Sequence, residues 1–138
     1  MKNQLSTIHW DRVWLASGVA SVLSFCAITV VITAYTMNLA IQTQGAPDEA
    51  QISRFADQMG YWGGPTLALL LTIGAAAWAT RRVETKAGLH GALVGLFVAV
   101  IGLILSLIFG EGLSLWEMMT FALTVGAGWL GGVLGRPK

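Results

Sequence analysis

The charged residues of this chain are separated by four long stretches that contain none. The stretches lie between Arg12 and Asp48, between Asp57 and Arg81, between Lys86 and Glu111, and between Glu117 and Arg136. A helix needs about 20 residues to cross the hydrocarbon core of a bilayer. Because lipid offers the backbone no water to bond with, such stretches are predicted to be helical. The predicted spans are residues 13–38, 62–80, 88–109 and 115–134.

Two other interpretations of these stretches fit less well. A soluble helix bundle would show a polar residue at every third or fourth position, whereas residues 67–78 and 92–109 have no polar face. A secretory signal peptide would explain the first stretch, but its apolar run is longer than usual and no clear cleavage site follows. We therefore predict an all-α polytopic membrane protein. It is one domain over residues 1–138, with four transmembrane helices arranged as two antiparallel hairpins.

The basic residues predict how the chain is oriented. All but one of them fall on the same side of a four-span arrangement, and the positive-inside rule makes that side cytoplasmic. Both termini are therefore expected inside, and the connection 39–61 outside. The residues on the inner side are Lys2, Arg12, Arg81, Arg82, Lys86, Arg136 and Lys138, with Arg54 alone on the outer side.

The outer connection, residues 39–61, carries the pattern of a short helix. Pro47, Asp48 and Glu49 suit a helix start, since acidic side chains interact favourably with the positive end of the helix dipole. Apolar residues then recur at spacings of three and four, ending at Met59. We predict a short amphipathic helix that lies on the outer membrane surface or caps the bundle. A docking site for another protein or a ligand is the alternative role.

Small residues form stripes along the predicted spans. Membrane helices associate where small side chains let their backbones approach. Packing within the chain is one use of these stripes, and a surplus face on the fourth span for a second subunit is the other. The candidate helix-packing residues are Gly91, Gly95 and Gly102 in the third span, and Gly128 and Gly132 in the fourth.

Composition narrows the function further. Only 11% of residues are charged and the net charge is +1, which argues against nucleic acid as a partner, since clustered basic charge supplies that affinity. The single cysteine, Cys26, excludes an intramolecular disulfide. No nucleophile–base pair, zinc-protease motif, phosphate-binding glycine loop or acidic metal cluster is found. We therefore expect no enzymatic activity.

Few ionisable residues approach the predicted membrane interior. Glu117 is the nearest, and two hypotheses apply to it: an interfacial residue interacting with the dipole of its helix, or a proton- or cation-linked role together with Glu111. His9 and His90 are both predicted at the cytoplasmic interface, where a histidine pair can ligate a haem. Because Trp10 separates His9 from the lipid, we expect no haem and no other cofactor.

Two functions remain in view. The first is a non-catalytic accessory or assembly subunit, or a homo-oligomer, which packs against itself or other membrane subunits in the lipid bilayer. The second is a small dimeric transporter or channel with a polar path through the bundle. In that second hypothesis the candidate transport and gating residues are Ser17, Ser21, Ser24, Thr72, Glu111 and Glu117.

Two short segments carry a family resemblance. The opening Ile8-His-Trp-Asp-Arg-Val13 and the run Gly88-Leu-His-Gly-Ala-Leu-Val-Gly95 resemble segments of small, uncharacterised bacterial four-span membrane proteins. Those proteins often begin with a Trp-Gly-Arg-Val type segment, and Asp11 replaces its glycine here. The two segments together cover about fifteen residues, which is the length of a short motif. It implies a location in the bacterial cytoplasmic (inner) membrane and no activity.

Overall fold

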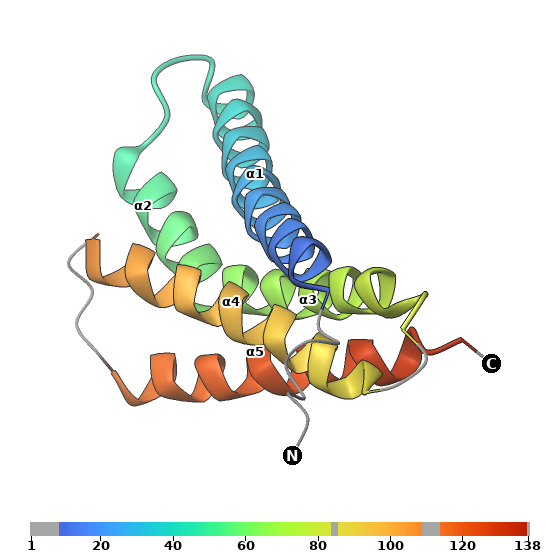
Figure 1. Ribbon diagram of the computed structural model, residues 1–138. Helices are drawn as coiled ribbons and strands as arrows, with labels where there is room; N and C mark the ends of the chain where they lie inside the picture. Colours follow the sequence, from blue (N-terminus) through green and yellow to red (C-terminus); the bar gives the residue numbers. More distant parts are fainter. Residues whose placement is uncertain (1–8, 84–85, 109–113, 138) are drawn as a thin grey trace.

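The computed structural model describes residues 9–83, 86–108 and 114–137. Within these ranges the protein is all-α (Figure 1). Its helices are α1 (Trp10–Thr43), α2 (Glu49–Gln58), the π-helix η2 (Met59–Gly63), α3 (Gly64–Thr80), α4 (Ala87–Ile108) and α5 (Leu115–Leu134). Four helical segments of the described chain are long and apolar enough to cross a membrane, namely α1, Glu49–Thr80, α4 and α5. The predicted four-span membrane fold is confirmed.

The first two membrane helices are longer than the predicted spans. α1 continues past residue 38 to Thr43, and α2, η2 and α3 join into a single helix, so that the non-helical connection shrinks to residues 44–48. Charge-free stretches mark the hydrocarbon core, but a helix can extend beyond it where polar side chains bond locally. Gln42 Nε2 donates to Asn38 Oδ1 at 2.7 Å, and the Asp48 side chain accepts from the Ala50 N–H at 3.0 Å as the N-cap of α2.

A π-turn joins α2 to α3. The N–H of Gly64 donates to the carbonyl of Met59, five residues earlier, and Pro65 follows at the start of α3. Proline has no N–H, and its ring clashes with the carbonyl four residues back in a regular helix. The wider π-turn accommodates this defect without breaking the helix. The helix predicted from the Pro47-Asp48-Glu49 pattern is therefore present, but it continues directly into the second span.

The contact between α4 and α5 is the most extensive among the described helices. A Cβ on Gly128 would lie 2.7 Å from the Cα of Gly95, and a Cβ on Gly91 would lie 2.6 Å from the Cα of Gly132. Only hydrogen atoms fit between backbones this close, which is the geometry that small residues allow in membranes. The two backbones therefore touch across this glycine crossing.

The second small face of α5 packs against α3. A Cβ on Gly131 would lie 2.9 Å from the Cα of Ile73, and one on Gly135 would lie 2.6 Å from the Cα of Ala77. The surplus face considered for a second subunit is therefore largely occupied within the chain. Two other glycines, Gly102 on α4 and Gly126 on α5, have nothing within 4 Å of a Cβ. Among the described residues, Gly102 therefore makes no close helix contact, so its predicted packing role stays a prediction.

Helix α1 is buried in the bundle along only about the first half of its length. Its buried residues run from Val13 to Ser24, and none lies beyond. At 34 residues it is about 51 Å long, well over the thickness of a hydrocarbon core. Figure 1 shows its later half leaning away from α4 and α5, joined to α2. The rings of Tyr35 and Phe55 stack at 3.9 Å between centroids and connect these two helices.

The glycine crossing predicts a position-specific response to one added methyl group. We expect Gly128→Ala to destabilise the fold by about 2 kcal/mol, because overpacking a tight contact forces the backbones apart. Gly126→Ala is the matched control on the same helix, where a Cβ meets open space. Reversible unfolding in mixed micelles of mild and denaturing detergent measures both. Equal stability of the two variants would contradict the observed contact.

Candidate functional site

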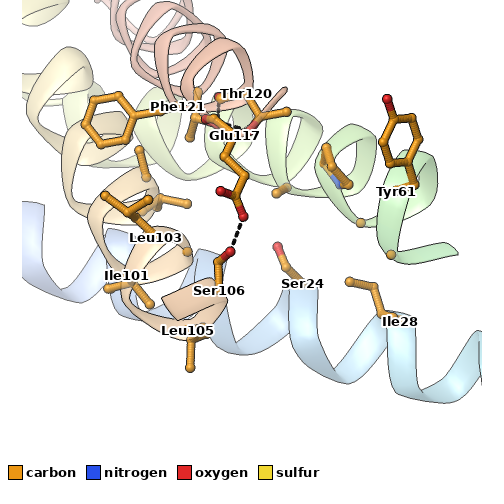
Figure 2. A pocket seen from close by; sticks show the side chains of 18 of the residues that line it. Ser24, Ile28, Tyr61, Ile101, Leu103, Leu105, Ser106, Glu117, Thr120 and Phe121 are labelled. Carbon is orange, nitrogen blue, oxygen red and sulfur yellow. Dashed lines mark hydrogen bonds between the residues drawn. The ribbon is translucent and has the colours of Figure 1, made fainter. Parts of the chain in front are cut away.

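A cavity of about 640 Å³ opens at the end of the bundle opposite the start of α1 and the end of α5. We call the end that holds Trp10 and Gly135 the N/C end, and the other the opposite end. The cavity is lined by the middle of α1, the α2–α3 helix, the second half of α4 and the first half of α5 (Figure 2). Its size lies within the range of small-molecule binding sites.

The cavity arises where the membrane helices separate. α4 and α5 diverge from the glycine crossing towards the opposite end, while α1 leans outward (Figure 1). On α5 the lining extends from Ser114 to Thr124, which is about 15 Å along a helix. The cavity is therefore about half as deep as a hydrocarbon core. Beneath it, Val13, Ser17 and Val94 are fully buried and close the N/C half of the bundle.

Glu117 connects α4 and α5 at the wide end of the cavity. Its Oε1 accepts a hydrogen bond from the hydroxyl of Ser106 on α4 (Figure 2), and its Oε2 accepts from the backbone N–H of Ser114 at 3.0 Å. In return the Glu117 N–H donates to Ser114 Oγ at 3.3 Å, which completes a capping box at the start of α5. Glu117 is partly exposed, and its carboxylate accepts hydrogen bonds from neutral donors.

The charges around the cavity have a single sign. Asp57 on α2 and Glu117 on α5 are the charged residues in its described lining, which includes no lysine, arginine or histidine. Most of the remaining lining is apolar or aromatic. The aromatic residues in it are Phe25, Tyr61, Trp116 and Phe121.

Three aromatic side chains tie the α2–α3 helix to α5 beside this cavity. The rings of Tyr61 and Trp116 stack at 4.8 Å between centroids with 12° between their planes. Trp62 meets both rings edge-on, at 5.1 Å from Tyr61 and 5.0 Å from Trp116. Edge-to-face and stacked pairs of this kind stabilise contacts beyond the area they bury. This aromatic cluster fixes one wall of the cavity.

The structure brings together only part of the predicted transport set. Ser21 and Ser24 line the cavity with Glu117. Ser17 lies deeper, where its hydroxyl donates to the carbonyls of Val13 at 2.8 Å and of Val94 at 3.2 Å. Thr72 is also fully buried and does not line the cavity. The polar path is therefore interrupted in this conformation, and Glu111 lies outside the described residues.

Several members of the site were not predicted from the sequence. Ser106, Asp57 and Thr120 line the cavity but were not singled out. Of these, Ser106 could have been predicted. It lies about as many residues before the connection between the third and fourth spans as Glu117 lies after it. Two positions equally far from a hairpin turn face each other at the same depth. The inward lean of α2 that brings Asp57 to the cavity has no local signal.

The two histidines do meet, but away from this cavity. The rings of His9 and His90 lie 6.4 Å apart at the N/C end, inclined by 38°. Nδ1 of His90 lies 3.1 Å from the carbonyl oxygen of Lys86, and its buried Nε2 has no hydrogen-bond partner among the described residues. Within the described chain, no group of three or more His, Cys, Asp and Glu side chains is placed to hold a metal ion.

Comparison with protein-family models, with curated proteins and with solved structures gave no match for this chain. What the structure supports is the coarser class, a small membrane protein with four membrane-spanning helices. The comparisons therefore add no support for the family resemblance of the two short segments, residues 8–13 and 88–95.

The capping box predicts a measurable stability difference. Ser114→Ala removes the acceptor for the Glu117 N–H, and loss of an N-cap costs about 1 kcal/mol. Glu117→Gln should cost less, because glutamine also completes a capping box. Thr66→Ala serves as control, since that exposed hydroxyl bonds only within its own helix, to the carbonyl of Trp62. Detergent unfolding compares the three, and a Ser114→Ala variant as stable as Thr66→Ala would overturn the assignment.

Proposed function

We propose that this protein is a non-enzymatic carrier that binds a small organic molecule in the cavity and moves it across the bilayer. The observation that carries the proposal is the cavity itself, which gathers Ser21, Ser24 and Glu117 between four separate helical segments. Ionisable groups at membrane depth are costly and commonly mark a substrate path.

One end of the bundle is open and the other is closed, which favours a carrier over a continuous channel. The closed half is held by the glycine crossing and by the fully buried Val13, Ser17 and Thr72. Carriers alternate between states that open to either side by moving one group of helices against another. α1 is suited to such movement, because its buried residues end at Ser24 and its later half contacts the α2–α3 helix instead of α4 and α5.

The accessory or homo-oligomeric role stays a prediction. It relied partly on small residues left free for a partner, and the glycines of α5 contact α4 and α3 instead, except for Gly126. The dimer that accompanied the transporter hypothesis is likewise a prediction. Native mass spectrometry in mild detergent measures both states directly.

We also propose a bacterial inner-membrane location with both termini in the cytoplasm. In the described chain, Arg54 is the basic residue at the opposite end. The positive-inside rule then directs the cavity outward. The support for this topology is that most basic residues of the described chain lie near the N/C end: Arg12, Arg81, Arg82, Lys86 and Arg136.

Single-cysteine labelling tests this orientation. In a Cys26→Ser background, a cysteine at Asp48 should react with a membrane-impermeant maleimide in intact cells, because the connection 44–48 is expected outside. A cysteine at Arg82, exposed at the N/C end, should react only after the cells are broken. The reverse pattern would place the cavity on the cytoplasmic side and contradict the proposed topology.

Filling the cavity tests the binding function. Three benzyl probes of similar shape differ in head-group charge: benzyltrimethylammonium, phenylmethanesulfonate and benzyl methyl sulfone. We expect at least one to bind the purified protein in equilibrium dialysis, and to cross proteoliposome membranes faster than in protein-free vesicles. Gly102→Trp should abolish both, because Gly102 lines the cavity and leaves open space for a side chain.

Gly126→Trp is the matched control, since that glycine has equally open surroundings and does not line the cavity. Binding that survives Gly102→Trp, or that is lost equally in both variants, would refute the cavity as the binding site. Binding without accelerated flux would refute transport and leave a binding protein.

A further inference from the structure

The cavity carries negative charge with no positive charge in its described lining. We propose that its ligand is a small organic cation: a quaternary or protonated amine attached to an apolar or aromatic body. This inference rests on the proposed function above and names the substrate class of the same site.

The partners of Glu117 favour a cation over any other charge. Its two carboxylate oxygens accept hydrogen bonds from the Ser106 hydroxyl and the Ser114 N–H, neither of which neutralises the charge. Asp57 adds a second carboxylate to the lining. Asp57 is exposed and Glu117 partly exposed, so water screens part of their attraction for a cation, but the attraction has the same sign for both carboxylates. An anion would meet the same field as repulsion.

The aromatic lining favours an organic cation over an inorganic one. Phe25, Tyr61, Trp116 and Phe121 line the same cavity as the two carboxylates. Aromatic ring faces attract cations within about 6 Å, and this attraction suits weakly hydrated ammonium groups best. A hard metal cation instead needs six or more oxygen ligands, and the described residues include no group of three candidate metal-binding side chains.

A neutral polar group completes the set. The hydroxyl oxygen of Ser21 is buried, lines the cavity on α1 and has no hydrogen-bond partner among the described residues. A buried hydroxyl without a partner costs free energy, which a ligand can recover once the Ser21 side chain turns towards it. The site therefore offers a carboxylate on α5, aromatic faces, and one unused hydrogen-bonding group on α1.

The same benzyl probes separate the charge classes. We expect benzyltrimethylammonium to bind at least tenfold more tightly than benzyl methyl sulfone, and phenylmethanesulfonate to bind more weakly still. Glu117→Gln should weaken binding of the cation at least tenfold while leaving the sulfone unchanged. Glutamine keeps the capping box, so the variant should stay folded, which its unfolding midpoint checks.

Glu49→Gln is the control for net charge. Glu49 is an exposed carboxylate in the first turn of α2 and does not line the cavity. It should leave the affinity for the cation unchanged. Rising salt should weaken binding to the wild-type chain, since screening reduces attraction between charges, and should affect the Glu117→Gln variant less.

The outcomes distinguish this inference from the function on which it rests. Binding of the sulfone or the sulfonate at least as tight as that of benzyltrimethylammonium, and blocked by Gly102→Trp, would overturn the cationic ligand and keep the binding cavity. Equal affinity of Glu117→Gln and wild type for the cation would overturn the role of Glu117. Failure of all three probes to bind would overturn both proposals together.

Discussion

The close approach of α4 and α5 is the constraint on which the rest of the structure depends. Lipid tails are as apolar as leucine, so burying a large apolar side chain gains little inside a bilayer. Gly91 and Gly95 on α4 meet Gly128 and Gly132 on α5 with backbones in direct contact. That contact maximises van der Waals attraction and allows Cα–H groups to face carbonyl oxygens. Because α3 contacts the other small face of α5, three helices become one rigid unit.

The cavity follows from where that contact ends. Beyond Gly128, the line of α5 residues facing α4 continues through Thr124, Phe121 and Glu117. Side chains of this size hold the helices apart, and α1, whose buried residues end at Ser24, does not fill the space. The carboxylate of Glu117 then bridges the separated helices through Ser106. Because the helices pack tightly at the N/C end and separate at the opposite end, the bundle is closed at the first and open at the second.

The position of Glu117 explains how a charged residue can be part of a membrane helix. It lies in the first turn of α5, where its carboxylate interacts favourably with the positive end of the helix dipole and with unpaired N–H groups. The two hypotheses for this residue, a helix cap or a cation-linked group, are therefore compatible. The capping box holds the carboxylate in place beside the cavity, and the two donors that bond to its oxygens are neutral.

The sequence alone determined the architecture of this protein. Absence of charge over four stretches is a direct consequence of the cost of burying ions in lipid, so the four membrane helices could be predicted without any tertiary information. The pattern Pro47-Asp48-Glu49 likewise predicted the start of α2, because capping is a local interaction. Small-residue spacing indicated Gly91, Gly95, Gly128 and Gly132, whose contact depends on residue size alone.

Only the tertiary structure decided which of these residues share a site. Ser17 and Ser24 lie on one face of α1 and are both buried, yet the first bonds to α4 inside the bundle and the second lines the cavity, because the neighbouring helices α4 and α5 diverge at its level. Gly102 continues the small stripe of α4 but faces open space, since α5 has already moved away. Spacing along a helix defines its faces. The angle at which two helices cross, which no single segment encodes, determines what each face meets.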